Sequence, residues 1–190
     1  RDKVSSNLSP MAAIAKYIKS TDEKSKVVFI GPCTAKKAEF QKKSICPFVD
    51  SVITFEELQA LFDSRDLDLT ALEENCLDNA SYFGRIFARS GGLSDAVRQA
   101  LKENNIKFDL NPLVCDGMEQ CRVALIRADK KLLPNNFIEG MACVNGCIGG
   151  AGCLTHGEKN KAEVDGYGME AFEKSISDAL SVVKGLNDGK

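Results

Sequence analysis

The sequence lacks the features that mark several large classes of protein. Its 27 acidic residues nearly balance its 25 Lys and Arg, so no basic excess attracts nucleic acid or an anionic membrane. No apolar run reaches the roughly 18 to 20 residues of a membrane-spanning helix, and residues 1–10 lack the basic-then-apolar order of a signal peptide. We therefore expect a globular, cytoplasmic protein that binds neither nucleic acid nor membranes.

Histidine is scarce, whereas cysteine is not. The one histidine, His156, stands in a polar stretch and is interpreted as a surface residue. Eight cysteines exceed what a cytosolic domain usually carries but are too few for a disulfide scaffold, so metal binding is the better interpretation. They stand at positions 33, 46, 76, 115, 121, 143, 147 and 153.

Residues 137–153 read FIEGMACVNGCIGGAGC and place Cys143 and Cys147 four residues apart among five glycines. A glycine-rich loop lets the backbone approach a bulky cofactor and supplies amides that hydrogen-bond cluster sulfurs. Because cysteine thiolates hold iron–sulfur clusters, we predict an iron–sulfur site here. Two alternatives stay open: the cysteines are small buried residues of the core, or they bind structural zinc, which usually needs a second closely spaced ligand pair.

Cap signals and apolar runs divide the chain into alternating helices and strands. Ser9 and Pro10 mark one helix start, and Thr54 with Glu57 forms a capping box that marks another. The expected strands are 27–30, 51–54, 107–115 and 137–138, and the expected helices are 10–20, 54–62, 94–103, 118–132 and 169–183. Residues 65–90 receive no assignment, and residues 154–166 are expected at the surface. The alternation predicts an α/β fold with a mostly parallel four-stranded sheet flanked by helices.

Three cysteines follow predicted strands. Cys33 follows the first strand, and Cys143 and Cys147 follow the fourth. Since α/β proteins bind ligands at the carboxyl ends of strands, the three thiols converge at one sheet edge if these strands are neighbours. Cys153 can complete a fourth ligand position or be incidental. Apolar packing is the favoured role for two other cysteines, Cys115 and Cys121.

The segment after Cys33 reads TAKKAE. Lys36 can place its ammonium beside an anionic cofactor and offset the negative charge of a thiolate-bound cluster. Glu39 can orient this region from the following turn. From this segment alone, an ordinary solvated helix start is the simpler interpretation of Lys36, Lys37 and Glu39.

Two longer motifs around these residues resemble signatures of a known family. Residues 29–39, FIGPCTAKKAE, resemble the second signature of the [FeFe]-hydrogenase (iron-only hydrogenase) large subunit, PC-x-x-K-x-x-E. Residues 139–152, EGMACVNGCIGGAG, resemble the third, E-x-M-x-C-x-x-G-C-x-x-GGG. Residues 51–61, 87–101 and 114–125 are similar to the elements between these signatures. The resemblance therefore covers nearly the whole chain.

The resemblance implies reversible oxidation of H2 at an H-cluster, a [4Fe–4S] cubane joined through a cysteine to a diiron unit with CO, cyanide and a bridging dithiolate. It implies that Cys33, Cys143 and Cys147 bind the cubane and that Cys147 also bridges to the diiron unit. The other positions it assigns to the site are Lys36 on a cyanide, Glu39 and Gly146 at the cofactor, Met141, Phe87 and Pro10 around the diiron pocket, and Ser5 on the proton-transfer route.

The chain also departs from the family pattern. The first signature, TSCCP-like, supplies the fourth cubane ligand and the proton-donating cysteine, and we expect it upstream of Arg1. Met11 replaces a usual Gln, Gly31 a usual Met and Cys153 a usual Gln, which resembles the sensory branch of the family.

We therefore expect residues 1–190 to be the C-terminal lobe of a hydrogenase catalytic domain that is inactive in isolation. The implied partners are the N-terminal lobe of the same polypeptide and a ferredoxin-like electron carrier. Two alternatives stay open: a sensor of H2 or redox state, and a non-enzymatic iron–sulfur assembly protein similar to the prelamin recognition factor.

Overall fold

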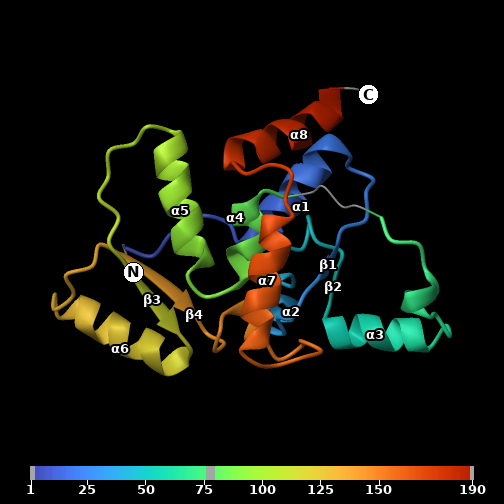
Figure 1. Ribbon diagram of the computed structural model, residues 1–190, viewed down its shortest axis with the longest axis horizontal. Coiled ribbons are helices and arrows are strands. Elements are labelled where there is room, and N and C mark those ends of the chain that lie inside the picture. Colours follow the sequence, from blue (N-terminus) through green and yellow to red (C-terminus); the bar gives the residue numbers. More distant parts are fainter. Residues whose placement is uncertain (1–2, 76–79, 189–190) are drawn as a thin grey trace. The chain divides into compact units, whose positions relative to one another are not determined.

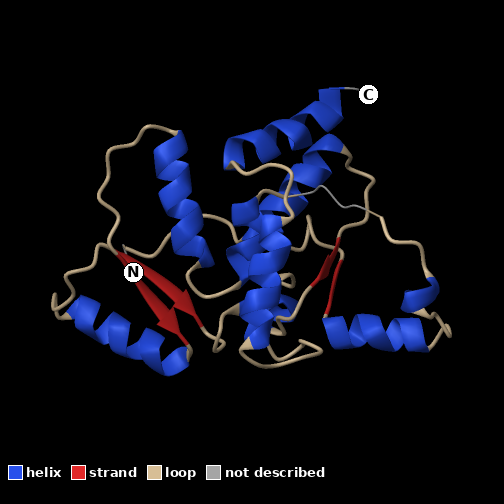
Figure 2. Ribbon diagram, in the orientation of Figure 1, coloured by secondary structure: helices blue, strands red, loops and turns tan. Residues whose placement is uncertain are grey.

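The computed structural model describes residues 3–75 and 80–188, so Cys76 lies outside the described residues. The chain is an α/β protein of helices and short strands (Figures 1 and 2). Its residues divide into two compact units. The first unit comprises Arg1–Asp68 and Ala151–Leu154, and the second comprises Leu69–Gly150 and Thr155–Lys190. Among residues 3–75 and 80–188, none of the helices combines the length and the hydrophobicity needed to span a bilayer.

The first unit is built around one parallel strand pair. Its elements are α1 (Pro10–Thr21), β1 (Val28–Ile30), α2 (Ala35–Glu39), β2 (Ser51–Ile53) and α3 (Phe55–Asp63). The strands β1 and β2 pair with Phe29 opposite Val52, and the predicted Ser9 cap and Thr54–Glu57 capping box are both confirmed. The helix α1 buries Met11, Ala12 and Ala15 in the same core cluster as Val52.

The second unit repeats the strand–helix–strand arrangement with longer strands. Its elements are η1 (Leu69–Ala71), α4 (Tyr82–Arg85), η2 (Ile86–Ala88), α5 (Gly92–Glu103), β3 (Pro112–Asp116), α6 (Met118–Asp129), β4 (Phe137–Met141), η3 (Cys147–Gly149), α7 (Lys159–Met169) and α8 (Ile176–Asp188). The strands β3 and β4 pair in parallel over five residues each, and α6 packs along them (Figure 1).

The prediction of one four-stranded sheet is wrong. The described strands form two separate two-stranded sheets, β1 with β2 and β3 with β4 (Figure 2). Strands consecutive in sequence pair most often, and here each pair closes its own crossover unit. The strand β1 is also not buried on both faces, since Val28 is 49% and Ile30 is 43% exposed. An apolar run shows that a strand forms but not which strand lies beside it.

Residues 154–166 lie at the surface as expected, all of them exposed or partly exposed, but they contain most of α7, for which the sequence predicted no helix. The single helix expected at 169–183 is replaced by the end of α7 and by α8. Gly166 and Gly168 lower the helix propensity of α7, so the sequence did not predict this helix. Gly168 is nevertheless needed for packing. A Cβ at Gly168 would lie 2.7 Å from the Ile86 side chain.

The helix expected at 118–132 is present as α6, but its large apolar residues do not mark the buried face. Met118 and Leu125 are 68% and 60% exposed, whereas Ala124 is only 3% exposed. The helix meets the β3–β4 pair through small side chains, which allow close approach to the strands. Helical spacing identified the helix, but the choice of face depended on side-chain size rather than on hydrophobicity.

Candidate functional site

Cys33 lies in the turn between β1 and α2. Its carbonyl accepts a hydrogen bond from the Lys36 amide at 3.2 Å, which opens α2, and the residue is partly exposed. The amide of Gly152 donates to the carbonyl of Pro32 at 3.0 Å. The segment that follows the glycine-rich cysteine loop therefore packs against the Cys33 turn within the first unit.

Glu39 holds Lys36 in a fixed direction. The ammonium of Lys36 forms an ion pair with the Glu39 carboxylate, and the hydroxyl of Ser9 donates to the same carboxylate. Both side chains of the ion pair are only about one-fifth exposed, at 21% and 20%. Burial raises the pKa of Glu39, but the bonds from Lys36 and Ser9, together with nearby positive charge, hold it below 4.5. This position fits the orienting role that the sequence suggested for Glu39.

Cys143 and Cys147 lie in one tightly turned loop after β4. The Gly146 amide donates to the Cys143 carbonyl at 3.0 Å, and the Gly150 amide donates to the Cys147 carbonyl at 2.9 Å. The amide of Asn145 donates to an Asp116 carboxylate oxygen at the end of β3. Both cysteines are partly exposed, and their thiols are positioned by a backbone that is itself hydrogen-bonded.

Gly146 allows this loop to meet a second backbone segment. Its φ is +82°, and an added Cβ would lie 2.7 Å from the Ser90 amide nitrogen and 2.8 Å from the Ala88 carbonyl oxygen. The Ser90 amide also donates to the Asn145 carbonyl at 3.2 Å, and Arg89 pairs with Gly146 as an antiparallel bridge. The cysteine loop therefore rests on residues 88–90.

Arg89 fixes those residues in turn. Its guanidinium forms ion pairs with Asp95 of α5 and Asp165 of α7. Burial lowers the pKa of Arg89, but the hydrogen bonds and charges of the two carboxylates outweigh burial and raise the pKa above its ordinary value. Ion pairs therefore connect residues 88–90, which contact the cysteine loop, to α5 and α7.

Glu139 belongs to the motif at 139–152, but the sequence analysis assigned it no role of its own. Its side chain is fully buried, at 0% exposed, and accepts hydrogen bonds from the Gly91 amide, the Ser94 amide and the Ser94 hydroxyl. The available signal was a charged residue inside an otherwise apolar strand. Burying an ionised carboxylate is costly unless donors surround it, so such a residue calls for a partner.

The remaining predicted residues are placed as follows. Met141 ends β4, and its carbonyl accepts a bond from the Gly117 amide at 2.9 Å. Phe87 lies in η2 in the same unit and is partly exposed. In the first unit Ser5 is exposed and accepts a bond from the Asn7 amide, and Pro10 is the first residue of α1. Their assignment to a cofactor pocket stays a prediction.

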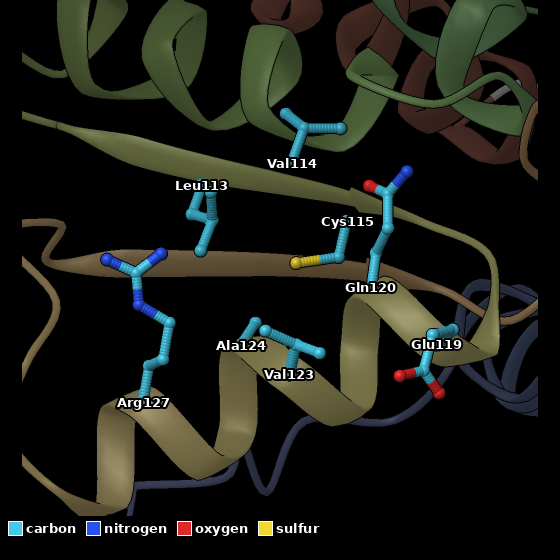
Figure 3. Close-up of a pocket in the computed structure, with 8 residues that line it drawn as sticks. All are labelled: Leu113, Val114, Cys115, Glu119, Gln120, Val123, Ala124 and Arg127. Atoms are coloured by element: carbon cyan, nitrogen blue, oxygen red, sulfur yellow. The ribbon is translucent and has the colours of Figure 1, made fainter.

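Of the other cysteines, Cys115 and Cys153 are buried and Cys46 is exposed. The Cys115 side chain points into a hollow of about 240 Å³ between β3 and α6 (Figure 3). Burial, with smaller effects from Cys121 and Glu139, raises the pKa of the Cys115 thiol, which fits a packing role. Across residues 3–75 and 80–188, no three His, Cys, Asp or Glu side chains form a group that could hold a metal ion.

Comparison with known proteins decides the family. A sequence model described as the iron-only hydrogenase large subunit, C-terminal domain, matches residues 1–151, which include Cys33, Cys143 and Cys147. The chain belongs to this family. Iron hydrogenase 1 of Clostridium pasteurianum is 26% identical over 172 residues, covering 73% of this chain and 30% of that relative.

Solved [FeFe]-hydrogenases share the fold. One of them was studied for oxygen inactivation, which is initiated by modification and degradation of the 2Fe subcluster of its H cluster. It matches this chain with a TM-score of 0.62 and 18% sequence identity, and the match covers 95% of this chain and 63% of that structure. HydA1 of Chlamydomonas reinhardtii matches with a TM-score of 0.56 and 16% identity over 87% of this chain and 58% of its own. The chain thus spans less than two thirds of each relative.

Proposed function

We propose that this chain is one lobe of an iron-only hydrogenase catalytic domain and that Cys33, Cys143 and Cys147 bind the cubane of its H-cluster. The observation that carries the proposal is the loop from Cys143 to Gly150, where two thiols lie on a hydrogen-bonded backbone in the family's third motif. Membership in the family supports a hydrogenase as the parent enzyme.

The thiols of the two motifs have the donor chemistry that such a group needs, although no three metal-binding side chains of the described residues are already gathered. Thiolates are the donors that iron–sulfur clusters require, and both cysteines of the loop are partly exposed rather than packed in a core. The first unit contains both Cys33 and the segment Ala151–Leu154, which begins four residues after Cys147. The polypeptide itself therefore supplies a short tether between the two motifs. When bound, an H-cluster supplies the electron transfer and the H2 chemistry.

The chain's own residues would hold and orient that group. Lys36 has three N–H donors, and its bond to Glu39 leaves others for an anionic ligand such as cyanide. Because Glu39 fixes the ammonium, Lys36 would present its charge without first losing side-chain freedom. Met141 and Phe87 would provide apolar walls, and Ser5 would belong to the proton route.

The full reaction, H2 ⇌ 2H+ + 2e−, would need more than this chain. We propose that the N-terminal lobe supplies the fourth cubane ligand and the proton-donating cysteine, and that a ferredoxin-like carrier exchanges the electrons. The share of each relative that this chain spans supports a second lobe. Thiolate ligands favour a reducing compartment, and the proposed location is the cytoplasm.

Anaerobic reconstitution with iron and sulfide tests the proposal. We expect the chain to take up iron and sulfide with the absorption and low-temperature EPR of a reduced cubane, and Cys147→Ser to lose that signal. Cys46→Ser is the matched control, because Cys46 is exposed and outside both motifs. Failure of the chain to bind iron, or equal binding by Cys147→Ser, would contradict the assignment.

The same reconstituted sample tests the need for a second lobe. With chemically reduced viologen as electron donor, we expect H2 production at background level, because the proposed proton-donating cysteine is not among these 190 residues. Sustained H2 production would show that this chain alone provides the acid and all the ligands it needs, which would refute the two-lobe proposal.

A further inference from the structure

The Glu139 side chain has no exposed surface. Its carboxylate caps the N-terminus of α5, a helix that precedes β4 in the second unit. One oxygen accepts the Gly91 amide at 2.8 Å, and the other accepts the Ser94 amide at 2.8 Å and the Ser94 hydroxyl at 2.6 Å. Both amides lie at the N-terminus of α5, where the helix leaves donors unpaired and concentrates positive potential. Both carboxylate oxygens therefore accept hydrogen bonds, and the N-terminus of α5 compensates the buried negative charge.

The capped turn is the surface on which the cysteine loop rests. Gly91 directly follows residues 88–90, whose backbone contacts Gly146 and donates to Asn145. From the other side, Glu139 is four residues before Cys143 in the same strand and loop. The carboxylate thus joins the strand that leads into the loop to the turn that supports it.

We infer that Glu139 is a positioning residue for the thiols of Cys143 and Cys147. It acts by holding residues 89–91 against the loop, and it makes no contact with a cofactor in this role. The effect of Glu139 on cluster binding rests on the proposed iron–sulfur function, because a displaced loop would displace two of the three cubane ligands. The effect on the loop itself can be measured without any metal.

A carboxylate is required by the geometry of the three donors. The side chain introduced by Glu139→Gln would offer one acceptor oxygen and one NH2 group, so a donor would face the Gly91 or Ser94 amide. A buried donor without an acceptor is costly, and the turn would move away from β4. Ser94→Ala is milder, because it removes the hydroxyl bond and leaves both amide bonds in place.

The chain offers a closely matched control in Glu103. Its carboxylate accepts the Ile176 amide, the Ser177 amide and the Ser177 hydroxyl, at 2.9, 2.9 and 2.6 Å, at the N-terminus of α8. These donors match those of Glu139 in kind, and they lie on another helix of the same unit. The Gln99 side-chain amide also donates to Glu103, at 2.6 Å, and Glu103 is partly exposed where Glu139 is buried. Because they belong to the start of α8 and not to the turn at 89–91, Glu103→Gln removes an equivalent cap at a different place.

Native-state hydrogen exchange of metal-free protein is the first measurement. Glu139→Gln is expected to speed exchange of the amides at 145–150 roughly tenfold, as the loss of a charged hydrogen-bond acceptor would. Glu103→Gln is expected to leave these amides at wild-type rates and to speed exchange at the start of α8. Unchanged loop exchange in Glu139→Gln, or equal acceleration in Glu103→Gln, would overturn the inference.

Ser94→Ala keeps the test decisive if Glu139→Gln does not fold. It is expected to accelerate the same loop amides by about threefold, since one neutral hydrogen bond is lost. Wild-type exchange in the loop of Ser94→Ala would then overturn the inference.

Iron-loaded protein provides the second measurement. If the wild type binds iron, Glu139→Gln is expected to alter the EPR of the reduced sample and Glu103→Gln to preserve it. Identical spectra for the two variants would reject a positioning role. If the wild type binds no iron, the proposed function fails, while the exchange result still decides whether Glu139 positions the loop.

Discussion

At the scale of single residues, carboxylates and one glycine set the positions of the sulfur-bearing segments. Glu39 directs Lys36, Asp116 accepts the Asn145 amide, and Glu139 holds the turn beneath the loop. Gly146 lets two backbone segments approach more closely than a side chain would allow. Together these contacts fix the backbone from which the cysteine side chains project.

Gly146→Ala is expected to destabilise the second unit by about 2 kcal/mol. The substitution forces an L-residue to φ +82° and places its Cβ 2.7 Å from the Ser90 amide nitrogen. Urea denaturation followed by circular dichroism measures the change. Gly166→Ala in α7 is the control, because nothing lies within 4 Å of its Cβ position, and it should stabilise the chain slightly. Equal effects from the two substitutions would disprove the close-contact explanation.

The stability that Glu39 provides should disappear in acid. Its folded pKa lies below 4.5, so its contribution is complete above that pH and is lost as the pH falls through the folded value. The difference in free energy of unfolding between wild type and Glu39→Gln should therefore shrink as the pH is lowered from 7 through 4.5. Glu23→Gln, in an exposed turn, should show no such difference. A difference that grows on acidification would contradict the ion pair.

The sequence predicted the cysteines, Lys36 and an orienting role for Glu39, but not the residues that support the cysteine loop. A ligand can be recognised from its own chemistry and its spacing along the chain. The role of Glu139 depends on Gly91 and Ser94, which lie more than 40 residues earlier in the sequence. Only the fold brings such donors to the carboxylate.

At the scale of elements, the sequence predicted where helices begin better than it predicted which strands pair. The Ser9 cap and the Thr54–Glu57 capping box are local signals, and both helices begin where these residues place them. The four-stranded sheet failed because strand order depends on contacts between distant segments. The buried face of α6 depends on such contacts too, because close packing on β3 and β4 buries Ala124 rather than larger apolar residues.

Thr54→Ala should cost about 1 kcal/mol of stability in the first unit. The substitution removes the side-chain oxygen that accepts the Glu57 amide at 3.2 Å, and this cap is buried, with Thr54 at 5% exposed. Urea denaturation at neutral pH provides the value. Thr21→Ala, at the exposed end of α1, should stay within about 0.5 kcal/mol of wild type. A cost for Thr54→Ala no larger than this control would contradict the capping box.

At the scale of the whole molecule, the chain leaves the first unit, forms most of the second, and returns at Ala151–Leu154 before completing the second unit. The return comes directly after the cysteine loop, and the Gly152 amide binds the Pro32 carbonyl beside Cys33. We propose that this path serves to join the two cysteine motifs at one cluster.

Thiol footprinting of the reconstituted protein tests that claim most directly. Each cysteine is alkylated with iodoacetamide before and after iron and sulfide are added, and its modification is measured by peptide mass spectrometry. We expect Cys33, Cys143 and Cys147 to become protected together at the same iron concentration, while Cys46 stays reactive. Protection of Cys143 and Cys147 with Cys33 still fully reactive would contradict a single cluster held by both motifs.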